Sequence, residues 1–225
     1  MKKRDIAFII ILISLFAGIV VLLETGKIIK IESIFYGFLA KHINTEFTIF
    51  FKTITYIGGP VAIALFCITL LIFHHTRKSY GIPVCITLVS SYVLNFILKH
   101  VFLRPRPDIL RLVTEKSYSF PSGHSMINAS IYTILILLML SNANKKGKKI
   151  IISISLVILF VLIGISRIYL GVHYLGDVIA GWILGVLVAF IVYLVFRKIK
   201  ILKNNEVWLE VNQICTSLFF YKFIY

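Results

Sequence analysis

Acidic residues and cysteines are scarce in this 225-residue sequence. It has 9 Asp and Glu against 24 Lys and Arg, and 3 cysteines in all. Cys67, Cys85 and Cys215 show neither the paired spacing of a disulfide framework nor the spacing of a zinc site. Two of them lie within apolar runs, where a cysteine is usually a small buried hydrophobe. The sequence therefore predicts neither a disulfide-stabilised domain nor a metal centre built on cysteine.

Charged residues of either sign are also few, at 15% of the chain, whereas hydrophobic residues make up 59%. A soluble domain has about 25% charged and about 45–50% apolar residues. The excess of apolar residues falls in long runs that are almost free of charge and that have roughly the length needed to cross a bilayer. These runs are 6–23, 54–73, 81–98, 125–140, 150–165 and 178–196. They predict an all-α, polytopic membrane bundle with about six transmembrane helices.

The formal net charge of +15 raises the alternative of a nucleic-acid-binding protein. Such proteins gather lysine and arginine on one solvated face. Here the basic residues form short clusters between apolar runs instead, which is typical of the orientation signal of membrane proteins. We therefore expect no nucleic-acid partner and a chain in contact with the bilayer.

The basic clusters also predict how the chain is oriented. With six spans, all of them fall on the side that holds both termini: 2–4, 77–78, 145–149 and 197–200. The positive-inside rule makes this side cytoplasmic. The loops at 99–124 and 166–177 then lie together on the extracytoplasmic side. We expect a multi-pass protein of the cell membrane with both of its chemically rich loops facing outward.

One segment between the first two runs is expected to form a short helix that does not span. Its apolar residues recur at helical spacing: Ile31, Ile34, Phe35, Phe38 and Leu39. The polar residues Lys30, Glu32, Ser33 and Lys41 lie off this stripe. We expect the helix to lie at the membrane interface or to pack over the spans. Residues 1–203 form the predicted membrane domain, and 204–225 form a tail. Its apolar part, 214–225, is too short to span and suits the membrane surface.

Three short segments in the two outer loops carry residues suited to phosphate chemistry. They are Lys99 with Arg106-Pro107, then Pro121-Ser122-Gly123-His124, then Ser166-Arg167 with His173 and Asp177. Each has a purely structural alternative, as cations beside lipid headgroups, a turn with a helix cap, or a buried histidine. Their convergence on one side of the membrane favours a common site.

The spacing of His173 and Asp177 indicates the chemistry of that site. If the chain is helical from about His173, Asp177 lies one turn later on the same face. Its carboxylate can hold one imidazole nitrogen and leave the other free as a nucleophile. Arg167 brings a permanent cation to the same place, as a phosphate site requires.

Taken together, the three segments resemble the signature of the type 2 phosphatidic acid phosphatase superfamily, the integral-membrane lipid phosphate phosphatases. Lys99-(x6)-Arg106-Pro107, Pro121-Ser122-Gly123-His124 and Ser166-Arg167-(x5)-His173-(x3)-Asp177 match it without departure. The resemblance implies that His173 is a nucleophile forming a phosphohistidine and that Asp177 orients it. It implies that His124 is first the general acid for the leaving alkoxide and then the base that activates water.

The same resemblance assigns the phosphate-binding residues: Lys99, Arg106, Ser122, Gly123 and Arg167. Fixed cations and helix N-terminal N–H groups stabilise a phosphoryl group in transfer without help from a metal ion. We therefore expect no metal and no cofactor. No motif in the sequence predicts a protein partner.

The expected function is metal-independent hydrolysis of a lipid phosphate at the outer membrane face. The family includes enzymes for polyprenyl pyrophosphates, such as undecaprenyl pyrophosphate, and for glycerolipid phosphates, such as phosphatidylglycerophosphate or phosphatidic acid. The compact six-span layout resembles bacterial members and leaves both substrate classes open.

Three alternatives were weighed against hydrolysis. Vanadium-dependent haloperoxidases share the signature, but they are soluble, and six apolar runs argue against that function. A channel is disfavoured because the runs contain few ionisable residues. A non-catalytic protein that binds or moves lipids would retain the same fold. Against it stands the presence of His124, His173 and Asp177 together, which such a protein does not need.

Overall fold

The computed structural model describes residues 2–108, 111–141 and 146–201. Within these ranges every regular element is a helix, which confirms the all-α prediction. The long helices are α1 (Lys3–Glu24), α6 (Ile82–Phe102), α7 (Gly123–Ser141), α8 (Lys146–Tyr169) and α9 (Leu175–Ile201). The shorter ones are α2 (Ile28–Ala40), α3 (Thr45–Ile57), α4 (Pro60–Ile72), α5 (His74–Thr76) and the π-helical turn η1 (Arg77–Gly81). The predicted tail at 204–225 lies outside the described residues.

Six helical segments of the described chain are long and apolar enough to cross a membrane, as predicted. They are Lys3–Glu24, Thr45–Ile72, His74–Phe102, Gly123–Ser141, Gly147–Tyr169 and Leu175–Ile199. The second begins at Thr45, whereas the sequence predicted a start at 54. This segment consists of two helices, α3 and α4. Because α3 contains several polar residues, it does not form an uninterrupted apolar run, and the sequence therefore predicted only the second part. The helices join at Gly59, whose extended backbone precedes Pro60 at the first position of α4.

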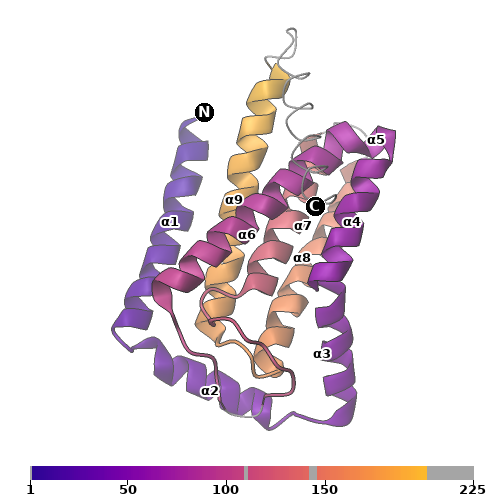
Figure 1. Cartoon of the computed structure of the whole chain (residues 1–225). Helices are drawn as coiled ribbons and strands as arrows, with labels where there is room; N and C mark the ends of the chain where they lie inside the picture. Colours follow the sequence, from indigo (N-terminus) through magenta and orange to yellow (C-terminus); the bar gives the residue numbers. More distant parts are fainter. Residues whose placement is uncertain (1, 109–110, 142–145, 202–225) are drawn as a thin grey trace, which may run out of the picture.

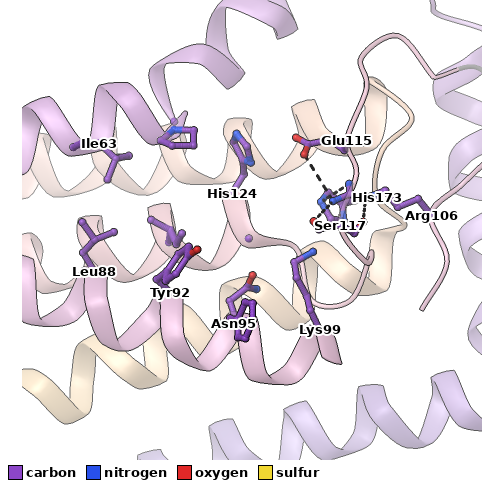
Figure 2. A pocket seen from close by; sticks show the side chains of 16 residues that line it. Ile63, Leu88, Tyr92, Asn95, Lys99, Arg106, Glu115, Ser117, His124 and His173 are labelled. Carbon is purple, nitrogen blue, oxygen red and sulfur yellow. Dashed lines mark hydrogen bonds and ion pairs between the residues drawn. The ribbon is translucent and has the colours of Figure 1, made fainter. Parts of the chain in front are cut away.

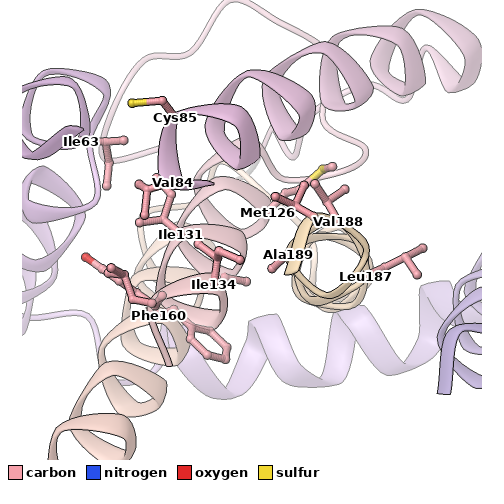
Figure 3. Close-up of a cluster of buried hydrophobic side chains, with 14 of the residues drawn as sticks. Ile63, Val84, Cys85, Met126, Ile131, Ile134, Phe160, Leu187, Val188 and Ala189 are labelled. Carbon is pink, nitrogen blue, oxygen red and sulfur yellow. The ribbon is translucent and has the colours of Figure 1, made fainter. Parts of the chain in front are cut away.

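Helix α7 lies at the centre of the bundle, between α6, α8 and α9 (Figure 1). Its apolar residues include Met126, which packs beside Val188 and Ala189 of α9 (Figure 3). Gly181 and Gly185 permit this contact: a Cβ atom on Gly185 would lie 2.4 Å from the carbonyl oxygen of Met126. The two backbones approach so closely that any larger residue would push α9 away from α7.

The close approach of α7 and α9 brings two distant parts of the sequence together. The N–H of Ser122, just before α7, donates to the carbonyl oxygen of Asp177 in the first turn of α9, at 3.0 Å. The second and third motifs of the sequence are therefore joined through the backbone. Both start their helices at the end of the bundle that also carries α2 and the connection between α6 and α7 (Figure 1).

Helix α2 crosses this end of the bundle between α1 and α3 and is not one of the candidate spans (Figure 1). Its existence as a short, non-spanning helix was predicted. Helix α2 contacts the ends of α8 and α9, but not through the apolar stripe, since Ile31, Ile34 and Phe38 are more than half exposed. Ile28 and Glu32 are the buried residues instead. The stripe is thus left uncovered by protein, and the side facing the bundle contains a carboxylate.

Candidate active site

His173 lies in the short turn between α8 and α9, and Asp177 lies in the first turn of α9. The helix begins at Leu175, two residues later than the spacing argument assumed. The two side chains meet nevertheless, with Nδ1 of His173 3.4 Å from Oδ2 of Asp177. The same Oδ2 accepts the N–H of Tyr174 at 2.9 Å, which caps the start of the helix. One carboxylate thus holds both the imidazole and the end of α9.

Two further donors, both missed by the sequence analysis, reach the carboxylate of Asp177. The hydroxyl of Ser119 donates to Oδ2 at 2.5 Å, and Nη1 of Arg104 donates to Oδ1 at 2.6 Å. Arg104 was not selected from the sequence because it matches no motif position. Ser119 is fully buried. Asp177 is therefore fully buried with hydrogen-bond donors at both oxygens, so its orientation is strongly restrained.

These contacts determine the state of His173. When Nδ1–H donates to Asp177, the lone pair of Nε2 is free to accept, and Nη1 of Arg106 lies 3.2 Å from it. Burial lowers the pKa of His173 to about 4, and the hydrogen bond to Asp177 offsets only part of this effect. At neutral pH the ring is uncharged, so Nε2 presents the lone pair that a nucleophile requires.

Arg106 is held rigidly beside His173 by backbone and side-chain acceptors. Its Nε donates to the carbonyl oxygen of Ser117 at 2.5 Å, and its Nη1 donates to the carbonyl oxygen of Val172 at 2.9 Å. Its Nη2 also contacts the Ser117 hydroxyl at 3.0 Å. A guanidinium fixed in this way offers a preformed fork to an anion, with little ordering left to occur on binding.

Arg167 and Lys99 reach the same region from two other helices. Arg167, near the end of α8, donates to Thr55 Oγ1 at 2.9 Å and pairs with Glu115. Its Nε is buried and has no hydrogen-bond partner among the described residues. Lys99, in the last turn of α6, donates to the carbonyl oxygen of Tyr118. The structure therefore brings the three predicted cations to one end of the bundle, with a buried N–H on Arg167 still lacking an acceptor.

The third predicted segment contributes the start of α7. His124 lies in the first turn and projects between the apolar side chains of α4 and α6 and the cluster around His173 (Figure 2). Gly123 lies beside it. Ser122 is fully buried. Its N–H donates to the backbone carbonyl oxygen of Asp177, so Ser122 connects α7 to α9 and not to a ligand. Of the two predicted anion-binding backbone positions, Gly123 is the one that lines the cavity.

A cavity of about 350 Å³ is lined by several of these groups, although Arg167, Ser122 and Asp177 lie behind its wall. One end is polar and is lined by Lys99, Arg106, Glu115, Ser117, His124 and His173 (Figure 2). The other end is apolar and lies between α4, α6 and α7, where it is lined by Pro60, Ile63, Ala64, Leu88, Phe96 and Ile127. Such a cavity suits a molecule with a phosphorylated head and an apolar chain.

Over residues 2–108, 111–141 and 146–201, no group of three or more His, Cys, Asp or Glu side chains is arranged to hold a metal ion. The carboxylates nearest the cavity are instead paired with cations, Glu115 with Arg167 and Asp177 with Arg104.

The comparisons with known proteins agree with the motifs. A model of the PAP2 superfamily matches residues 80–201. The chain belongs to this family. All the predicted site residues, from Lys99 to Asp177, fall within the matched range, whereas α1, α2 and α3 precede it.

Two relatives of this chain are named for lipid phosphates. Phosphatidylglycerophosphatase B of Bacillus subtilis is 42% identical over 127 residues, which cover 55% of this chain and 62% of that protein. An undecaprenyl-diphosphatase of Sulfolobus acidocaldarius is 38% identical over 128 residues, covering 54% of this chain and 57% of that protein. The chain thus matches less than two thirds of the length of these relatives.

Among solved structures, the transmembrane PAP2-type phosphatidylglycerolphosphate phosphatase of B. subtilis is similar, with a TM-score of 0.76 and 28% identity. The match covers 85% of this chain and 96% of that chain. LpxE of Aquifex aeolicus gives a TM-score of 0.59 at 29% identity, over 70% of this chain and 92% of its own. With six apolar helices and this fold, the chain is a multi-pass membrane protein.

Proposed function

We propose that this PAP2 protein is a metal-independent phosphatase of lipid phosphates that works through a phosphohistidine on His173. The observation that carries the proposal is the cavity, whose polar end is lined by Lys99, Arg106 and the His173 that Asp177 holds, and whose other end is apolar. A lipid phosphate has the same two parts. The phosphate lies at the polar end and the first part of the chain lies between α4, α6 and α7.

Binding places the phosphoryl oxygens among Lys99, Arg106 and Arg167. Glu115 occupies part of this region in the free protein, since it pairs with Arg167 and has one oxygen 3.9 Å from Nη2 of Arg106. The phosphate replaces Glu115 as the anion, and one of its oxygens accepts from the unpartnered Nε of Arg167. Fixed cations are suited to the charge that spreads over the equatorial oxygens in phosphoryl transfer.

In the first chemical step, Nε2 of His173 attacks phosphorus and the bond to the lipid oxygen breaks. The proton on Nδ1 stays hydrogen-bonded to Asp177, whose negative charge stabilises the cationic ring. His124 donates a proton to the leaving alkoxide. In the second step His124 accepts a proton from water, the water oxygen attacks phosphorus, and the bond between phosphorus and Nε2 of His173 breaks, which releases inorganic phosphate and neutral His173.

Two substrate classes fit the cavity, and the relatives are named for both. The B. subtilis relative is named for phosphatidylglycerophosphate and the S. acidocaldarius relative for undecaprenyl diphosphate. The deciding experiment measures phosphate release by the purified protein in detergent from undecaprenyl diphosphate, phosphatidylglycerophosphate and phosphatidic acid. The ranking of kcat/KM identifies the substrate class. Release from none of them would overturn the proposal in favour of a lipid-binding or lipid-moving protein without turnover.

Chelation is expected to leave activity unchanged. The cations of the proposed site are side chains, Lys99, Arg106 and Arg167, so no divalent ion is needed to neutralise the phosphate. Phosphate release in the presence of excess EDTA should equal release without it. A loss that magnesium or zinc restores would contradict the metal-independent mechanism.

The site is proposed to face the extracytoplasmic side. The N-terminus, α5 and the far end of α9 lie at the opposite end of the bundle from α2 and the site (Figure 1). Basic clusters lie at each of these places: 2–4, 77–78 directly after α5, and 197–200. Lys116 lies in the site-side loop and is exposed. In whole cells, a Lys116→Cys variant in a Cys215→Ser background should react with an impermeant thiol reagent, whereas the background alone, in which Cys67 and Cys85 are buried, should not. Labelling that requires permeabilised cells would reverse the orientation.

A further inference from the structure

Arg104 and Glu32 form a buried ion pair on the side of Asp177 that faces away from His173. Nη2 of Arg104 lies 2.6 Å from Oε2 of Glu32, and Nη1 lies 3.2 Å from Oε1. The same Nη1 lies 2.6 Å from Oδ1 of Asp177. The side chains of Arg104, Glu32 and Asp177 are 12%, 4% and 0% exposed. One guanidinium therefore joins a carboxylate from α2 to the carboxylate that holds the proposed nucleophile.

Glu32 and Arg104 also contact two residues that shortly precede Asp177, namely Gly176 and Tyr174. Oε1 of Glu32 accepts the N–H of Gly176 at 3.1 Å. A Cβ atom on Gly176 would lie 2.8 Å from that oxygen, so only glycine allows the approach. The guanidinium of Arg104 stacks on the ring of Tyr174, 4.2 Å from its centre. The start of α9 is therefore held from outside at three nearly consecutive residues.

We propose that Glu32 and Arg104 are positioning residues that aim the Asp177 carboxylate at Nδ1 of His173, which makes α2 a part of the active site. The proposal rests on the proposed function, because it assigns these residues a part in the same reaction. Arg104 fixes Oδ1, so Oδ2 points toward His173. Glu32 holds Arg104 in turn, and it precedes the range that the family model matches.

Charge balance explains why Arg104 needs Glu32. Burial alone would lower the pKa of Arg104, but the carboxylates of Asp177 and Glu32 outweigh it and raise the pKa. With Glu32, Arg104 and Asp177 all ionised, the trio has one net negative charge, which favours the cationic ring formed when His173 attacks. Without Glu32 the trio would be neutral, and the electrostatic support for that cation would weaken.

The two substitutions therefore have opposite effects on His173. Glu32→Gln removes a negative charge and is expected to lower the pKa of His173 further. Arg104→Gln removes a positive charge and is expected to raise it. The other ionisable groups around His173 are unchanged in both variants: Lys99 from α6, Arg106 and Glu115 from the α6–α7 loop, His124 from α7 and Arg167 from α8. If both residues had a purely structural role, the two substitutions would not shift the pKa of His173 in opposite directions.

The test compares Glu32→Gln, Arg104→Gln and the double variant with Glu46→Gln, a matched control at an exposed position of α3. For both single variants kcat should fall about tenfold or more with little change in KM, because the nucleophile and not the binding site is disturbed. The acid limb of kcat/KM, which reports the free enzyme, should move to lower pH in Glu32→Gln and to higher pH in Arg104→Gln. Variants that match the control in both respects would overturn the proposal.

Each single variant leaves one member of the buried Glu32–Arg104 pair without its partner and could fail to fold for that reason. The double variant leaves neither charge unpaired: it keeps the trio's single negative charge but leaves Asp177 without its guanidinium. Its kcat should stay below that of the control. A second readout is independent of turnover: the fraction of Nδ1-protonated His173, from ring ¹⁵N shifts in protein labelled with [¹⁵N]histidine, should fall in all three variants. If the unaltered protein releases no phosphate but this fraction falls, the positioning role stands and the phosphatase proposal fails. An unchanged fraction would overturn the positioning role.

Discussion

Replacing His173 with alanine is expected to abolish phosphate release from every lipid substrate. The imidazole is 2% exposed, its Nδ1 faces Asp177, and its Nε2 is the ring nitrogen presented to the cationic end of the cavity. Alanine removes the only protein atom proposed to attack phosphorus, so the phosphohistidine that water hydrolyses in the second step cannot form. The expected loss in kcat is about 10⁴-fold or more, the scale seen when a covalent nucleophile is deleted.

The measurement is single-turnover phosphate release, together with trapping of labelled phosphate on the protein. The unaltered protein should carry label that survives alkali and is lost in acid, as a phosphoramidate does, and His173→Ala should carry none. His75→Ala is the matched control, because His75 is exposed on α5 at the opposite end of the bundle. Substantial turnover by His173→Ala would exclude this histidine as the nucleophile, and trapped label at another residue would relocate the chemistry.

Replacing Asp177 with asparagine is the second change with a large expected effect. The carboxylate accepts hydrogen bonds from Arg104, Ser119, His173 and the N–H of Tyr174. Asparagine has one acceptor oxygen, and its NH₂ group must face some of these donors. If the NH₂ faces His173, it favours the tautomer that carries its proton on Nε2, which blocks the attacking lone pair. The expected loss in kcat is about 10³-fold or more, comparable to the loss when the orienting carboxylate of a catalytic triad is replaced.

A matched control for this substitution is Asp108→Asn, since Asp108 is exposed in the loop after α6. The ring ¹⁵N shifts of His173 should report the change of tautomer in Asp177→Asn and no change in Asp108→Asn. Thermal unfolding in detergent should show that Asp177→Asn is folded at the assay temperature. Activity within about threefold of the unaltered protein, on a folded variant, would mean that Asp177 does not orient the nucleophile.

The described structure also explains which parts of the candidate site were predictable. Lys99, Arg106, His124, Arg167, His173 and Asp177 could be selected because each falls at a defined spacing within a short segment. Arg104 could not, although it lies between Lys99 and Arg106, because its function depends on Glu32, which is 72 residues away. Ser119 likewise binds Asp177 across 58 residues. No local pattern marks a residue whose partner is that distant.

The sequence by itself determined the number of spans and the non-spanning helix, and it selected the six charged or imidazole side chains of the candidate site. These depend on local quantities: the length of an apolar run, helical periodicity, and the spacing of polar residues at the ends of runs. Tertiary structure alone decided that α3 extends the second span, that α2 turns Glu32 toward the bundle, and that Arg104 and Ser119 hold Asp177. Packing decided these points, because a buried carboxylate or guanidinium is stable only where the fold supplies its counter-charge, and that partner comes from another helix.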